Sequence, residues 1–237
     1  MKAAVRGLLR RFGFEVTRIP AEFSAPETRR TVILRDQRTQ LLVDVGAARG
    51  GYSRNARRCG FAGEIVSVEP RSDAFRDLVR EASGDERWRC YRAALGEVDG
   101  SGTLSLSRRG TSSSLLQMLP EHERVAPESG PAGTEEIEIL RLDSLLSRIG
   151  LMGLPSFLKL DVQGYEGHVL GGATAAMEFV RAVEVELSTR KLYEGGILFR
   201  SLVDKLDDLG FQPISFDEVL LEPGTGFVLQ FDGIFIR

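Results

Sequence analysis

The stretch LLVDVGAARGGYS, from Leu41 to Ser53, decides the fold of this chain. Its first residues are typical of a short buried strand, which ends close to an acid, Asp44. A glycine-rich turn from Gly46 to Gly51 follows, and after it comes a segment that can begin a helix. A strand, a glycine turn and a helix in this order form the first turn of a nucleotide- or cofactor-binding α/β unit.

The spacing of the glycines indicates which class of cofactor this turn accepts. A dinucleotide site has glycines at the first, third and sixth positions, which here are Gly46, Ala48 and Gly51. The missing third glycine and the nearby carboxylate of Asp44 both disfavour an anionic pyrophosphate. A ligand with a cationic amino acid end fits better, and S-adenosylmethionine carries an ammonium and a sulfonium but no phosphate. An NAD-dependent oxidoreductase is the alternative within the same fold.

The composition limits the class of protein without naming its chemistry. A chain of 237 residues with 42% hydrophobic and 27% charged residues is typical of a soluble globular protein with one large domain. The net charge of −3 gives no electrostatic reason to expect a nucleic acid partner. No apolar run approaches the roughly 20 residues needed to cross a bilayer. Without a secretory signal, the expected location is the cytoplasm.

Residues 1–40 differ from the rest and are expected to form a basic N-terminal helical segment ahead of one domain at 41–237. They hold nine Lys or Arg against four acids, a net +5 that leaves −8 for the remainder. Apolar residues recur at helical spacing between Val5 and Phe12. The simpler interpretation is a helix packed on the domain with solvated charges. The alternative is a basic face in 1–18 that makes weak contact with a membrane surface or meets an anionic substrate.

From Leu41 onward, strand and helix patterns alternate, which predicts an α/β fold with a mostly parallel sheet and helices on both faces. The strands are expected at 41–45, 64–69, 88–93, 156–161 and 180–187, followed by an antiparallel C-terminal hairpin near 211–216 and 227–236. The helices are expected at about 51–59, 72–82, 143–149 and 198–209, with another beginning near Tyr165. Segments 101–106 and 135–141 alternate as strands do and are expected to extend or decorate the sheet. Residues 108–134, between them, are predicted to be the least structured part.

Three acids fall at the carboxyl ends of predicted parallel strands, namely Asp44, Glu69 and Asp161. That edge of an open parallel sheet is where ligands bind. Glu69 can accept hydrogen bonds from both hydroxyls of a ribose, and Asp44 can orient an ammonium group or cap the turn. Asp161 can accept the proton of a hydroxyl that attacks a methyl group. Lys159 lies on the same face of its strand and can hold Asp161 in place, contact substrate, or form a structural ion pair with it.

Several motifs together resemble the FkbM-type methyltransferases over about residues 41 to 216: DVGAARGGYS, VSVEP, LDSL and FLKLDVQGYEGHVLGGA. The most specific is K-x-D-x-x-G-x-E followed by V-L-x-G, from Lys159 to Gly171. The resemblance implies a class I S-adenosylmethionine-dependent O-methyltransferase that acts on a hydroxyl of a sugar, glycan or secondary metabolite. The chain departs from the family at Ala48 and Arg49, where an asparagine and a smaller or variable residue are usual. A catalytically silent binding module with this fold is the remaining alternative.

The residues and the resemblance together define the expected site. The expected cofactor contacts are Asp44, Gly46, Tyr52, Ser53, Glu69, Pro70, Ala94 and Asp161. The expected catalytic residues are Asp161, Lys159 and Glu166, although Glu166 also fits a carboxylate favoured by the positive end of a helix. The expected substrate contacts are Ser113, Ser114, Glu186 and Tyr193. We expect no metal; a magnesium site formed by Asp161 and Glu186 is the alternative. His122 is expected on the surface of a loop, or as the base if that loop closes.

Overall fold

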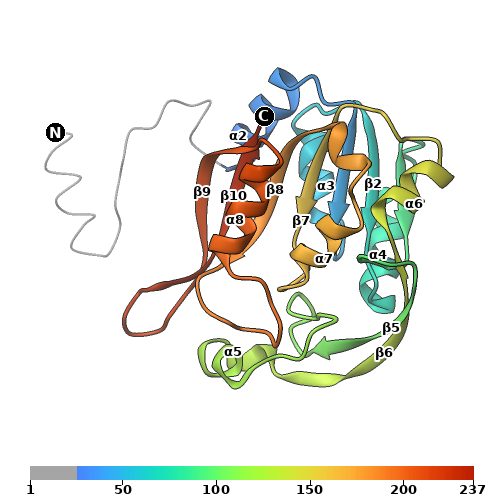
Figure 1. Ribbon diagram of the computed structural model, residues 1–237. Coiled ribbons are helices and arrows are strands. Elements are labelled where there is room, and N and C mark those ends of the chain that lie inside the picture. The colour runs from blue at the N-terminus through green and yellow to red at the C-terminus, as the bar shows by residue number, and fades with distance from the viewer. Residues whose placement is uncertain (1–25) are drawn as a thin grey trace, which may run out of the picture.

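Seven strands form a central sheet in the order β3-β2-β1-β7-β8-β10-β9 in the computed structural model, which describes residues 26–237 (Figure 1). The first five are mutually parallel, and β10 runs antiparallel to both β8 and β9. The strands are β1 (Leu41–Val45), β2 (Glu64–Val68), β3 (Trp88–Tyr91), β7 (Ser156–Leu160), β8 (Val180–Ser188), β9 (Gln212–Leu221) and β10 (Val228–Ile236). The predicted α/β fold with its C-terminal antiparallel hairpin is confirmed. The helix expected around residues 5–12 lies outside the described residues.

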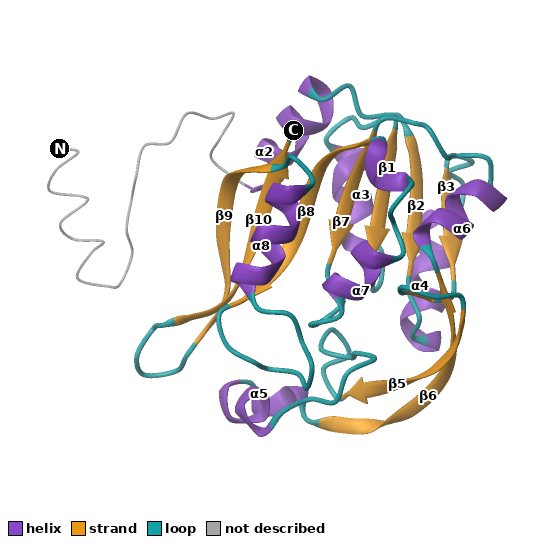
Figure 2. Cartoon of the chain, in the orientation of Figure 1, coloured by secondary structure: helices purple, strands orange, loops and turns teal. Residues whose placement is uncertain are grey.

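Helices cover both faces of this sheet because the strands are apolar on both sides (Figure 2). One face packs against α6 (Leu142–Arg148), α7 (Glu166–Gly171) and α8 (Phe199–Asp208). The other packs against α2 (Pro26–Asp36), α3 (Gly51–Arg58) and α4 (Ser72–Ala82). Short 3-10 turns lie at Pro127–Ser129 and Ala176–Glu178. No helix among residues 26–237 has the length and apolar character needed to span a membrane.

The segments at 101–106 and 135–141 were expected either to extend the central sheet or to decorate it. The structure excludes the first of these two expectations. The two segments belong to β5 (Gly100–Ser107) and β6 (Pro131–Leu140), which with β4 (Ala94–Leu95) form a separate three-stranded sheet. Its own small core explains the separation, because Ala94, Leu104 and Ile137 pack together. The small sheet lies beyond the carboxyl edge of the central strands (Figure 1).

The prediction that 108–134 is the least structured part is wrong for its second half. This segment contains α5 (Pro120–Val125) and a 3-10 turn, and β6 begins within it. Residues Ser112, Ser114, His122 and Ser129 in it are buried. Isolated bridges join Ser105 to Ser114 and Met118 to Tyr193 and so attach the segment to the rest of the fold. The polar composition of residues 108–134 predicted a loop, but contacts with residues distant in the sequence give this segment a defined structure.

The strand register places charged side chains next to one another on the face covered by α2 and α3. Asp44 of β1 lies beside Lys159 of β7, which lies beside Glu184 of β8. Glu186 of β8 similarly lies beside Asp232 of β10. Because residues two apart in a strand point to the same side, these five side chains form a polar layer within the sheet's helix-covered face.

Candidate active site

A cavity of about 420 Å³ lies at the carboxyl edge of the central sheet, between the turn after β1 and the small sheet. This volume is within the range of cofactor and ligand pockets. Seven residues predicted for the site line it: Gly46, Glu69, Pro70, Ala94, Ser113, Ser114 and Asp161. Its apolar lining includes Val68, Leu95, Leu104 and Tyr165. The cavity therefore combines an apolar surface with charged side chains: Glu69 and Asp161 come from different strand ends, and Arg49, Arg71, Asp73, Arg108 and Arg109 also line it.

The glycine-rich turn forms one wall of the cavity. Gly46 has a φ of +75°, and a Cβ there would collide with the backbone carbonyl of Asp161, so this position requires glycine. Ala48 also has a positive φ, +47°. Arg49, the unusual residue of the turn, forms ion pairs with Asp77 and Asp73 of α4. The arginine thus ties the turn to the neighbouring helix.

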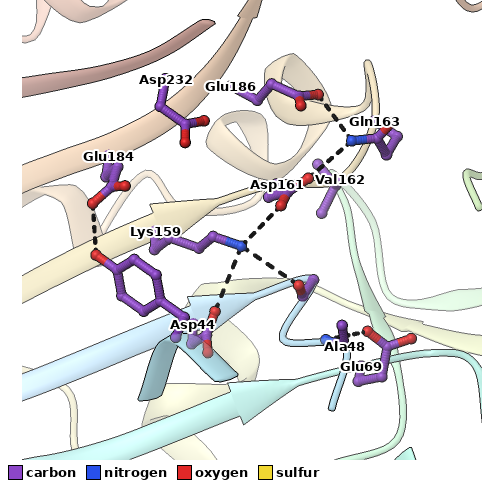
Figure 3. A network of polar contacts seen from close by, with 12 residues as sticks. Asp44, Ala48, Glu69, Lys159, Asp161, Val162, Gln163, Glu184, Glu186 and Asp232 are labelled. Atoms are coloured by element: carbon purple, nitrogen blue, oxygen red, sulfur yellow. Dashed lines mark hydrogen bonds and ion pairs between the residues drawn. The ribbon is translucent and has the colours of Figure 1, made fainter. Parts of the chain in front are cut away.

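Glu69 is fixed at the end of β2 with its carboxylate on the cavity wall (Figure 3). The backbone N–H of Ala48 donates to its Oε2 at 2.8 Å, and the N–H of Arg71 donates to its Oε1 at 2.9 Å. Burial raises the pKa of Glu69 to about 7, although these two hydrogen bonds act in the opposite direction. Each oxygen keeps a free lone pair for a further donor, such as a ribose hydroxyl.

Lys159 connects the acids of β1 and β7 (Figure 3). Its Nζ lies 3.2 Å from Asp161 Oδ2, 3.7 Å from Asp44 Oδ1 and 3.5 Å from the carbonyl oxygen of Gly46. Burial acts to lower the pKa of Lys159, but the carboxylates of Asp161 and Asp44 outweigh it and raise that pKa. Lys159 is therefore a charged residue, held beneath the turn and directed toward Asp161.

Asp44 and Ser53 lie beneath the turn and do not line the cavity. Asp44 is fully buried, accepts a hydrogen bond from Ser53 Oγ at 2.7 Å, and has a pKa raised by burial. Ser53 is fully buried as well. In this position Asp44 and Ser53 support the turn and Lys159, and their cofactor contact stays a prediction.

Tyr52 also lies away from the cavity, in a cluster that the sequence did not predict. Its hydroxyl donates to Glu184 Oε2 at 2.6 Å, and the Nε of Arg30 in α2 donates to both oxygens of Glu184 at 2.8 Å. The structure thus places the Tyr52 hydroxyl in this buried cluster, and its cofactor contact stays a prediction. Only the register of β7 and β8, which sets Glu184 beside Lys159, would have indicated the cluster.

Asp161 is the acid whose side chain reaches the cavity from β7, with an exposed fraction of 39%. Glu186 is buried, and the side-chain amide of Gln163 lies between it and Asp161. Glu186 and Tyr193 do not line the cavity, so their predicted substrate contact would require a rearrangement. Among the described residues, no three His, Cys, Asp or Glu side chains are grouped as metal ligands.

The chain's family is shown by its similarity to known proteins. The sequence model of the FkbM methyltransferase domain family matches residues 44–213. The chain belongs to the FkbM methyltransferase family. A curated relative, the 2-O-methyltransferase NoeI of Sinorhizobium fredii, is 24% identical over 188 residues and covers 75% of each chain. The solved structure of an rRNA methylase from Streptococcus thermophilus matches with a TM-score of 0.51 at 10% identity, covering 92% of this chain and 99% of that one. That likeness supports the fold alone.

Glu166 of this FkbM methyltransferase stabilises the turn after β7. It is buried, and its Oε1 accepts the backbone N–H of Val162 at 3.2 Å and that of Gly164 at 3.1 Å. Burial raises the pKa of Glu166 to about 7. It does not line the cavity, so its geometry supports a structural role in preference to the predicted catalytic one.

A Glu166→Ala variant should lose about 2–4 kcal/mol of unfolding free energy, because two buried N–H groups lose their acceptor. Glu166→Gln should stay within about 1 kcal/mol of the wild type, since its amide oxygen can replace Oε1. Because the pKa of Glu166 is raised in the folded state, the carboxyl proton is bound more tightly there than in the unfolded chain. The stability that this proton contributes is fully present at low pH and is lost as the pH rises through about 7. Gln should remove that part of the pH dependence. Urea unfolding at pH 6 and 8 measures both effects, and equal stability of all three proteins would contradict this role.

The two histidines of the FkbM methyltransferase do not line the cavity. His122, expected on a loop surface, is buried in α5, with its ring edge-to-face against Tyr193 at 5.1 Å between centroids. Burial lowers its pKa, which favours the neutral ring. His168 stacks on Tyr165 at 4.3 Å. Neither position supports a catalytic base in this arrangement.

Proposed function

We propose that the chain is an S-adenosylmethionine-dependent O-methyltransferase whose acceptor is a hydroxyl of a sugar, glycan or other small metabolite. The observation that carries the proposal is that Glu69 and Asp161, from different strand ends, line the same cavity beside a glycine turn. The family membership and the 2-O-methyltransferase relative support it.

The residues around the cavity match the chemical parts of this cofactor. Glu69 would accept the ribose hydroxyls, and Pro70, Ala94 and Leu95 would provide an apolar surface for the adenine. The altered glycine spacing, with Ala48 at the third position, favours a ligand without a pyrophosphate. When bound, S-adenosylmethionine supplies an electrophilic methyl group on a sulfonium.

In this proposal, Asp161 would accept the proton of the acceptor hydroxyl, while the bound cofactor would supply its methyl group to the hydroxyl oxygen and leave as S-adenosylhomocysteine. Lys159 holds one carboxylate oxygen of Asp161, and its positive charge is balanced by Asp44. Most of the rate enhancement would come from alignment of the two reactants, because methyl transfer needs little more than proximity and removal of a proton.

The pH should control the affinity for S-adenosylhomocysteine through Glu69. The ribose hydroxyls donate to the ionised carboxylate, so binding requires that Glu69 lose its proton. With a pKa of about 7, the affinity should fall about tenfold between pH 8 and pH 6. Calorimetric titration measures this. In Glu69→Gln the affinity should be weaker and independent of pH over this range; an equally steep dependence in the variant would exclude Glu69 as the cause.

A methyl-transfer assay with labelled S-adenosylmethionine tests the reaction. The acceptors would be simple methyl glycosides with free hydroxyls, including ones blocked at the 2-position, together with aliphatic and phenolic alcohols. Incorporation into a hydroxyl supports the proposal, and loss of incorporation on blocking the 2-hydroxyl would place the reaction at that oxygen. Tight cofactor binding without transfer to any acceptor favours the silent binding module.

A further inference from the structure

Gln163 has an unusual backbone conformation beside the proposed base. Among residues 26–237, only Arg38, Ala48 and Gln163 combine a side chain with a positive φ, and the φ of Gln163 is +56°. Such strain persists where surrounding contacts enforce it, and it is found preferentially at functional sites. One enforcing contact is Ser114 Oγ, which donates to the carbonyl oxygen of Gln163 at 2.9 Å.

The side-chain amide of Gln163 is fully engaged and joins two carboxylates (Figure 3). Its Nε2 donates to Asp161 Oδ1 and to Glu186 Oε2, each at 2.9 Å. An amide nitrogen has two protons, so both are used. The hydroxyl of Tyr193 lies 2.8 Å from Gln163 Oε1 and 2.9 Å from the carbonyl oxygen of Ser112, so it divides its single proton between two acceptors. This hydroxyl orients the amide with its nitrogen toward the acids.

Gln163 donates to two carboxylates, Asp161 and Glu186, and Asp161 is the one that it can influence most. Glu186 is buried, and burial, followed by the charge of Asp161, raises the pKa of Glu186 well above its usual range, which favours its neutral form. Asp161 is more exposed and faces the cavity. Its Oδ1 is held by Gln163 and its Oδ2 by Lys159, so both oxygens are fixed.

We propose that Gln163 is a positioning residue, which fixes the carboxylate of Asp161 from the side opposite Lys159. The inference rests on the proposed function, in which Asp161 is the base. Gln163 does not line the cavity, so it would act through Asp161 without touching the acceptor. The left-handed backbone is what turns the amide back toward the strand end.

The test is the NMR signal of the Asp161 carboxyl carbon at pH 8, recorded in protein labelled at aspartate and assigned with Asp161→Asn. This readout needs no acceptor. Gln163→Met removes the donor and keeps a similar length; Gln163→Gly removes it and also adopts the positive φ without strain. Both variants should move this signal away from its wild-type position, because the carboxylate loses a hydrogen bond. Affinity for S-adenosylhomocysteine should stay within about threefold.

Gln230→Met is the matched control. The Nε2 of Gln230 donates to the same Glu186 Oε2 at 2.7 Å but not to Asp161, so the Asp161 signal should stay close to its wild-type position. The other groups that act on Asp161 are retained in the Gln163 variants and the control: Asp44, Lys159, Glu166, Glu186, Tyr193 and Asp232.

An unchanged Asp161 signal in folded Gln163→Gly would overturn the inference, as would an equal displacement in Gln230→Met. If instead the signal moves as expected while Asp161→Asn keeps full turnover, the positioning contact stands and the base assignment of the proposed function fails. The two failures are therefore distinguishable.

Discussion

Asp161→Asn should lose about 100- to 10,000-fold in kcat while keeping its affinity for S-adenosylhomocysteine within about threefold. The amide has nearly the shape of the carboxylate and keeps an oxygen toward Lys159, but it cannot accept the proton of the acceptor hydroxyl. Under the proposed function, cofactor binding depends mainly on Glu69 and the turn, which this change leaves intact. The measurement is single-turnover transfer of labelled methyl to an acceptor found in the glycoside and alcohol panel.

Asp232→Asn is the control for this loss. Asp232 is a carboxylate on the same face of the sheet, and burial raises its pKa to about 6, but it does not line the cavity. Its variant should keep kcat within a few-fold of the wild type. Near-normal turnover in Asp161→Asn, or an equal loss in Asp232→Asn, would be inconsistent with Asp161 as the base.

Glu69→Ala should weaken the binding of S-adenosylhomocysteine by about 100-fold at pH 8. The change removes hydrogen bonds to an ionised carboxylate, which contribute about 1.5–3 kcal/mol each. It also leaves the N–H groups of Ala48 and Arg71 without their acceptor, which loosens the wall of the cavity. Glu64→Ala is the matched control because Glu64 lies on the same strand at the opposite edge of the sheet, paired with Arg89. Equal affinities of the two variants would remove Glu69 from the cofactor site.

Much of the fold could be predicted because apolar patterns repeat along the chain. The run from Leu41 to Val45 is buried at every position, which is why it was identifiable as a central strand. The glycine spacing of the turn and the acid Glu69 at a strand end predicted where the cavity lies, because both can be recognised in short stretches of sequence. The separate small sheet was not predictable, because strand alternation in 101–106 does not specify the partner strand.

The deeper part of the site depends on contacts that local sequence does not determine. Asp44 and Tyr52 are predicted to touch the cofactor, and the structure places them beside Lys159 and Glu184, outside the lining of the cavity. Gln163 stood inside the most specific motif, yet nothing in its residue type indicated a left-handed backbone. A side chain's partners across a sheet follow from register and layering, which become visible only in three dimensions.

Calorimetric titration of the wild-type protein with S-adenosylhomocysteine at pH 8, alongside NAD, is the most direct test of the central claim. The account predicts saturable binding of one S-adenosylhomocysteine per chain, a loss of about 100-fold in Glu69→Ala, and no measurable binding of NAD. Absence of binding by the folded protein, or NAD binding of equal strength, would contradict it.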